Sequence, residues 1–129
     1  CRLDFRQPPN LTVVFHDSCY LVRYHEVYDA PRDVITAVPG VDLVEMARSR
    51  EKGLCCGGGG GGMWLEVHSE RPIQEIRLEE AEASCPNIIA SACPFCMLMF
   101  DLGSKTLCLD EKGIELKDIA ELVAESIKA

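Results

Sequence analysis

The stretch LTVVFHDSC, residues 11–19, runs from an apolar segment into a cysteine. Residues 11–17 are rich in β-branched and apolar side chains, which predicts a short buried β-strand. Asp17 and Ser18 are good helix-capping residues, so we expect a helix to begin directly after them. Cys19 is therefore predicted to lie where a strand ends and a helix starts.

Two further apolar segments, residues 41–46 and 87–92, are also predicted strands. Segments with helical patterns lie between these strands and after the last of them. They cover residues 31–38, 69–84 (with Ser69 as the cap), 97–103 and 115–128. This alternation predicts an α/β fold, a small parallel sheet with flanking helices built from Rossmann-like βαβ units. Right-handed crossovers place all three carboxyl ends at one edge of the sheet, where open α/β sheets bind their ligands.

Five of the eight cysteines follow the predicted strands. Cys19 follows the first strand, Cys55 and Cys56 lie in the loop beyond the second, and Cys93 and Cys96 follow the third. We therefore expect five thiols to converge at the carboxyl edge of the sheet. Thiolates gathered in this way bind zinc or an iron–sulfur centre, so the sequence predicts a metal site there.

The segment GLCCGGGGGGMW, residues 53–64, favours the iron–sulfur centre. Adjacent side chains diverge, so one zinc ion seldom binds both cysteines, whereas a polynuclear cluster can bind them through different irons. Glycines let backbone N–H groups approach an anionic cluster. Gly57, Gly58 and Gly59 are the predicted backbone donors around it, and His16 is a candidate side-chain donor.

Two other functions remain open on the residues alone. One is a zinc-binding structural domain that docks onto a partner protein. The other is a dithiol redox module that uses Cys93 and Cys96, with a disulfide between Cys55 and Cys56. The glycine run also matches a dinucleotide-binding fingerprint, but the two cysteines before it do not fit such a site.

The composition of the chain argues against several classes of protein function. The chain has 129 residues, which suits one domain, and a net charge of −8 at pH 7, which disfavours nucleic-acid binding. No apolar run is long enough for a membrane span, and the polar N-terminal segment shows no secretory signal. We therefore expect a reducing, cytoplasmic location. His25 and His68 are predicted surface residues, and Cys1, Cys85 and Cys108 have no spacing that pairs them with the five.

Cys19 is separated from the adjacent cysteine pair by 35 residues, and that pair is separated from the Cys-x-x-Cys segment by 36 residues. This spacing resembles that of the cysteine-rich CCG domain. This family includes the B and D subunits of heterodisulfide reductase and related iron–sulfur oxidoreductases. The resemblance is carried by DSCYLVRYHEVYDAPRDVI (17–35), CCGGGGGGMW (55–64) and ACPFCMLMF (92–100). It assigns residues 12–129 to a single CCG domain and residues 1–11 to a truncated linker that leads into it.

The resemblance implies a [4Fe-4S] cluster, non-cubane in heterodisulfide reductase, although some family members hold zinc in one copy of the motif. Its ligands here would be the five cysteines, Cys19, Cys55, Cys56, Cys93 and Cys96. It also implies electron transfer with other redox subunits (a ferredoxin-like protein, a flavoprotein or a membrane cytochrome), or reduction of a thiol or disulfide. Such partners would place the chain in the cytoplasm or at the cytoplasmic face of a membrane.

Overall fold

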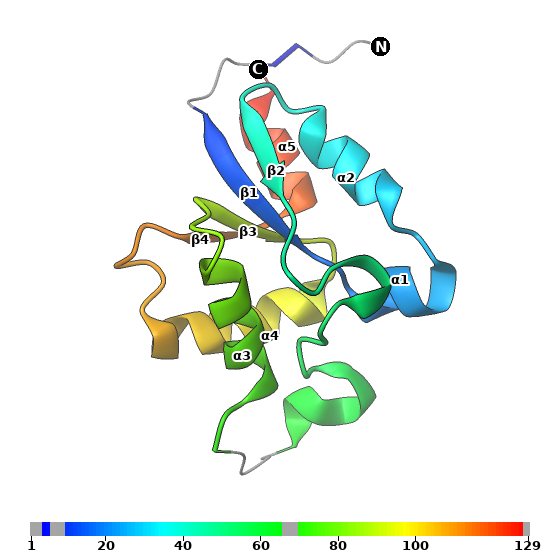
Figure 1. The fold of residues 1–129 in the computed structure, drawn as a ribbon, viewed down its shortest axis with the longest axis vertical. Helices are drawn as coiled ribbons and strands as arrows, with labels where there is room; N and C mark the ends of the chain where they lie inside the picture. Colours follow the sequence, from blue (N-terminus) through cyan, green and yellow to red (C-terminus); the bar gives the residue numbers. More distant parts are fainter. Residues whose placement is uncertain (1–3, 6–9, 66–69, 128–129) are drawn as a thin grey trace.

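The computed structural model describes residues 4–5, 10–65 and 70–127. The helices and strands follow one another along the chain as Figure 1 shows. In chain order they are β1 (Leu11–His16), α1 (Cys19–His25), α2 (Asp29–Thr36), β2 (Val41–Val44), two short 3₁₀ segments (Arg50–Lys52 and Gly59–Trp64), α3 (Ile73–Glu82), β3 (Ile88–Ser91), α4 (Pro94–Leu107), β4 (Glu115–Asp118) and α5 (Ile119–Ser126).

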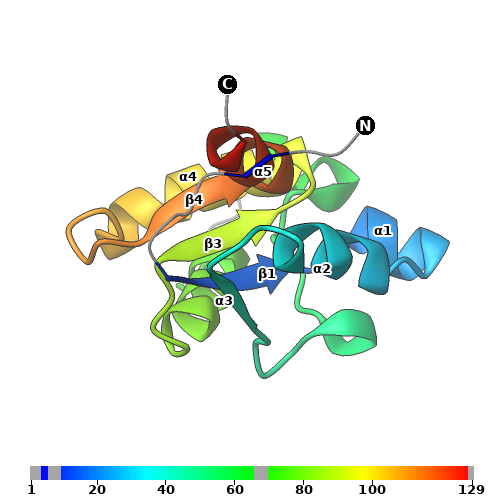
Figure 2. The ribbon, with the colours of Figure 1, turned by 90° about the horizontal axis from the view of Figure 1, so that it is seen from above.

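The sheet has the strand order β2-β1-β3-β4, and every neighbouring pair is parallel. In Figure 2 strands β1, β3 and β4 lie side by side. The predicted α/β fold with a parallel sheet and flanking helices is therefore confirmed. None of the helices formed by the described residues is both long enough and apolar enough to span a bilayer.

Helices cover both faces of the sheet. Val13 and Phe15 pack with Leu122 of α5 on one face, and Val14 packs with Phe100 of α4 on the other. Helices α2 and α5 contact each other, as do α3 and α4, so each pair forms one layer (Figure 1). Because successive side chains of a strand point to opposite faces, a strand covered on both faces reads as one continuous apolar run.

The prediction of a single helix over residues 115–128 is wrong. Residues Glu115–Asp118 form β4, which pairs with β3, and the helix begins only at Ile119. A capping box sets this start: Ala120 N donates to the Asp118 carboxylate at 2.8 Å, and Asp118 N donates to the Glu121 carboxylate at 2.9 Å. The residues before the cap are thereby left to extend the sheet by a fourth strand.

Other boundaries differ by a few residues. The strand predicted over 41–46 ends at Val44, and the helix predicted over 31–38 begins at Asp29 and ends at Thr36. Helix α3 begins at Ile73. Its predicted cap, Ser69, lies outside the described residues.

The sequence suggested that Asp17 caps α1, but its side chain forms a buried ion pair instead. Arg32 Nη1 and Nη2 each donate to one Asp17 carboxylate oxygen at 2.8 Å, and Arg50 N donates at 2.7 Å. Arg32 also binds Glu45. The interaction ties the end of β1 to α2 and to the loop after β2. Burial alone would raise the pKa of Asp17, but the hydrogen bonds from Arg32 and Arg50 outweigh it and lower the pKa.

Replacing Asp17 with asparagine should lower the free energy of unfolding by about 3 to 5 kcal/mol at neutral pH, because Arg32 would stay buried with one charge partner lost. The Asp17 side chain is 0% exposed and the Arg32 side chain is 6% exposed. Since a lowered pKa stabilises the fold only above that pKa, the difference from wild type should shrink as the pH falls through it. Urea unfolding at pH 7 and pH 3 measures both effects.

The matched control is Asp29→Asn, which removes an exposed ion pair with Arg50. The Asp29 side chain is 77% exposed, so this change should cost at most about 1 kcal/mol. An equal loss of stability in both variants would contradict the assignment of Asp17 as the buried anchor.

Candidate metal centre

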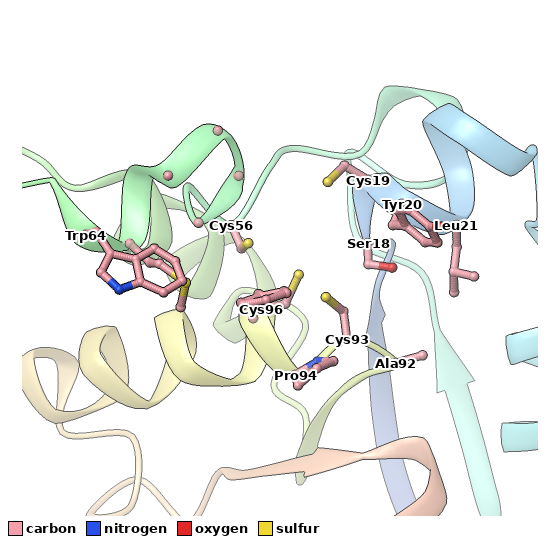
Figure 3. A pocket seen from close by; sticks show the side chains of 16 residues that line it. Ser18, Cys19, Tyr20, Leu21, Cys56, Trp64, Ala92, Cys93, Pro94 and Cys96 are labelled. Carbon is pink, nitrogen blue, oxygen red and sulfur yellow. The ribbon is translucent and has the colours of Figure 1, made fainter.

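Four of the five predicted cysteines line one cavity of about 500 Å³. Cys19 begins α1, Cys93 precedes α4, Cys96 lies in the first turn of that helix, and Cys56 belongs to the glycine loop. Their sulfur atoms face a common space in Figure 3. Three chain segments that are far apart in the sequence thus meet beside the carboxyl ends of β1 and β3.

Cys56 and Cys96 form the buried part of this group. Their Sγ atoms and a ring nitrogen of His16 all lie within 4.8 Å of one another. A hydrogen bond from the Cys96 thiol lowers the pKa of Cys56 and raises that of Cys96. Cys56 therefore loses its proton first and supplies the thiolate, which is the metal-binding form of cysteine.

Cys55 does not line the cavity, unlike its neighbour Cys56. Its Sγ accepts a hydrogen bond from Gly57 N at 3.3 Å. It nevertheless lies near the group. The pKa of Cys19 is raised first by burial and then by the charges of Cys55 and Cys56, so Cys55 is close enough to act on Cys19. The structure thus brings four thiols into one cavity and places the fifth beside it, as expected of adjacent side chains that diverge.

The chain matches the family described as the cysteine-rich domain, CCG, over residues 13–101. It belongs to the CCG family. The expected family is therefore confirmed, and the match includes all five cysteines of the motif, from Cys19 to Cys96.

Several curated proteins contain a segment similar to this CCG domain. It is 48% identical to the probable iron-sulfur-binding oxidoreductase FadF of Bacillus subtilis, over 126 residues. It is 39% identical, also over 126 residues, to the D subunit of the dihydromethanophenazine:CoB–CoM heterodisulfide reductase of Methanosarcina barkeri. It is 33% identical to the EtfAB:quinone oxidoreductase of Syntrophomonas wolfei. These matches cover 98% of this chain but only 18%, 30% and 18% of the three relatives. No solved structure matches the chain.

The cavity of the CCG domain suits a group that accepts hydrogen bonds. Ser18 lines the cavity, and its Oγ is buried without a hydrogen-bond partner among the described residues. The same holds for Nε2 of His16, whose ring lies beside Cys56 and Cys96. A buried donor without a partner costs about 1 to 3 kcal/mol. A bare zinc ion accepts no hydrogen bond, whereas a cluster carries sulfides that do. The residues present therefore fit an iron–sulfur cluster better than a single zinc ion.

The glycine loop needs glycine at particular positions. Gly57 has φ +85°, a conformation that side chains rarely adopt, and it turns the chain directly after the cysteine pair. A Cβ at Gly62 would lie 2.3 Å from Gly57 O. Gly58 and Gly59 line the cavity, but Gly57 does not. The predicted role of these glycines as donors to a cluster stays a prediction.

Arg77 was not predicted to belong to the site. It is fully buried, and its Nε donates to His16 Nδ1 at 3.1 Å. One signal in the sequence could have indicated its burial. Arg77 lies four residues from both Ile73 and Ala81, on the face of the helix where apolar side chains are expected.

Other candidate residues lie outside the site. His25 is exposed, as predicted, and Cys85 and Cys108 are exposed free thiols. Cys1 and His68 lie outside the described residues.

Replacing Gly62 with alanine should destabilise the domain by roughly 1 to 3 kcal/mol, because the added methyl group collides with the backbone of Gly57. Gly59→Ala is the matched control: its added Cβ meets nothing within 4 Å, and its φ is not positive. The control should change stability by less than about 0.5 kcal/mol. Urea unfolding compares the two variants, and equal stabilities would show that the loop is not packed as described.

Proposed function

We propose that this CCG domain holds an iron–sulfur cluster and transfers electrons within a larger iron–sulfur oxidoreductase. The observation that carries the proposal is a cavity lined by four thiols and by Ser18, whose buried hydroxyl has no partner among the described residues, with His16 close to two of those thiols. The names of two relatives, FadF and the heterodisulfide reductase of Methanosarcina barkeri, support it. When bound, the cluster would supply one-electron redox chemistry.

The proposed ligands are the five cysteines of the motif, Cys19, Cys55, Cys56, Cys93 and Cys96. We propose a [4Fe-4S] cluster of the non-cubane kind, because the adjacent pair diverges and can serve two different irons. Ser18 lines the cavity and has a buried hydroxyl without a partner among the described residues, so it is a proposed hydrogen-bond donor to the cluster. The buried thiolate of Cys56 is the proposed anchor of the cluster.

A thiol or disulfide is the proposed substrate of this site. Beyond the cysteines, the cavity is lined by aromatic and aliphatic side chains that include Tyr20, Trp64 and Phe95. These three side chains are also well exposed, so the cavity opens to solvent through an apolar mouth. Tyr20 and Trp64 are labelled in Figure 3. Reduction of a disulfide there would consume two electrons from a redox partner and two protons from solvent, and would yield two thiols.

The electron partners are proposed to be other redox subunits: a ferredoxin-like protein, a flavoprotein or a membrane cytochrome. The relative from Syntrophomonas wolfei is named an EtfAB:quinone oxidoreductase, which supports redox partners of this kind. We propose a location in the cytoplasm or at the cytoplasmic face of a membrane, reached through such subunits.

Anaerobic purification or reconstitution should give a brown protein that contains iron and acid-labile sulfide. Cys56→Ser and Cys93→Ser should each lose most of the iron, because each removes a thiolate that lines the cavity. The controls are Cys85→Ser and Cys108→Ser, which change exposed free thiols and should keep the full iron content. Metal analysis and visible absorbance measure the outcome.

Other results would favour the rival functions. A colourless protein with one equivalent of zinc would indicate a structural zinc domain. A metal-free protein whose Cys93 and Cys96 oxidise and reduce reversibly would indicate a dithiol module. Either result would overturn the iron–sulfur proposal.

The apolar mouth predicts affinity for organic sulfur compounds. An alkyl thiol such as 1-hexanethiol should alter the visible absorption spectrum of the reconstituted protein. Phe95→Ala should weaken its apparent affinity by roughly tenfold, which is about 1.4 kcal/mol, since burial of apolar surface contributes roughly 0.8 kcal/mol per CH₂ group. The control, Tyr24→Ala, removes an aromatic ring that is 75% exposed and outside the cavity. Equal affinities of the two variants would contradict the proposed binding mouth.

A further inference from the structure

A buried arginine contacts His16, the histidine beside the two buried cysteines. Arg77 on α3 has an exposed fraction of 0%. Its Nε donates to His16 Nδ1 at 3.1 Å, and its Nη1 donates to Arg48 O at 2.8 Å and to the Glu80 carboxylate at 3.1 Å. Glu80 also binds the Arg48 guanidinium at 3.0 Å. One carboxylate therefore serves two guanidinium groups, and the orientation of Arg77 is fixed from both ends.

This contact determines which nitrogen of His16 carries the proton. A guanidinium can only donate, so Nδ1 must accept with its lone pair and carries no hydrogen. A ring without a hydrogen on Nδ1 is neutral. The single ring proton is then on Nε2. That nitrogen is buried and has no hydrogen-bond partner among the described residues.

Nε2 is the ring nitrogen of His16 that Arg77 leaves available to the buried cysteines. A ring nitrogen of His16 lies within 4.8 Å of the Sγ atoms of both Cys56 and Cys96, and Nδ1 is already occupied by Arg77. If Nε2 instead bound a metal ion, it would need its lone pair, and the proton would move to Nδ1. Two N–H groups, of Arg77 and His16, would then point at each other.

We infer that Arg77 is a positioning residue that holds His16 in the Nε2–H tautomer, so that His16 donates a hydrogen bond to sulfur at the Cys56 position and is not a metal ligand. The tautomer is a property of the protein without metal. The effect on a bound cluster rests on the function proposed above. A hydrogen bond to a cluster sulfur stabilises the more negative, reduced state, so it raises the reduction potential.

The tautomer can be measured directly in the metal-free protein. The chain contains only three histidines, and exposed His25 provides an internal reference. Two-bond ¹H–¹⁵N spectra should show His16 as the Nε2–H tautomer in wild type and in Arg77→Lys, which keeps a donor. Arg77→Met removes the donor and should move the population toward Nδ1–H. A wild-type ring protonated on Nδ1 would overturn the inference.

The effect on the cluster is tested by two substitutions at His16. His16→Gln keeps an N–H donor near the position of Nε2, whereas His16→Phe keeps a ring without a donor. Both reconstituted variants should retain the iron content of wild type. The reduction potential should become more negative in His16→Phe and in Arg77→Met, and should stay close to wild type in His16→Gln.

Results that contradict this inference differ from results that contradict the proposed function. Loss of iron in both His16 variants would show that His16 is a ligand, and an unchanged reduction potential in His16→Phe would show that His16 is no donor. Either result overturns the inference. A wild-type protein that takes up no iron contradicts the proposed function instead, while the tautomer spectrum still decides the role of Arg77. If Arg77→Met does not fold, the wild-type spectrum and the two His16 variants decide the question.

Discussion

Parallel pairing of β1 with β2 on one side and β3 on the other is the constraint on which the site depends. Because neighbouring parallel strands run in one direction, the chain leaves β1 and β3 at the same edge, and the segments that carry Cys19 and Cys93 must start there. The buried ion pair between Asp17 and Arg32 then fixes how the chain turns from β1 into α1. The cysteine positions are thus set by the sheet rather than by contacts among the cysteines.

The carboxyl edge of the sheet carries buried polar groups that a stable interior would ordinarily avoid. His16, Ser18 and Ser91 are fully buried and carry polar atoms without partners among the described residues, and Arg77 is buried next to them. Such groups are costly unless something in the cavity accepts their hydrogen bonds. Their concentration at one edge of the sheet indicates a fold that is completed by what it binds.

Much of the architecture could be predicted because apolar runs and cysteine spacing are local signals. The strands that contain Val13 and Ile88 are short and apolar, so their burial was evident. β4 was missed because Glu115 and Lys117 are polar and the strand needs only one partner; its identity depends on the cap at Asp118. Arg77 could not be assigned to the site because its contact with His16 joins residues 61 positions apart. That contact exists only once α3 packs against the sheet.

The exposed tryptophan at the mouth of the cavity has an optical consequence. Trp64 is the only tryptophan in the chain, is 74% exposed, and lies against Phe95 with 6.4 Å between ring centroids. Indole emission is quenched by a nearby chromophore that absorbs in the near ultraviolet, as iron–sulfur clusters do. The domain therefore carries a built-in fluorescent reporter, whose brightness would record whether the cavity is filled without any added label.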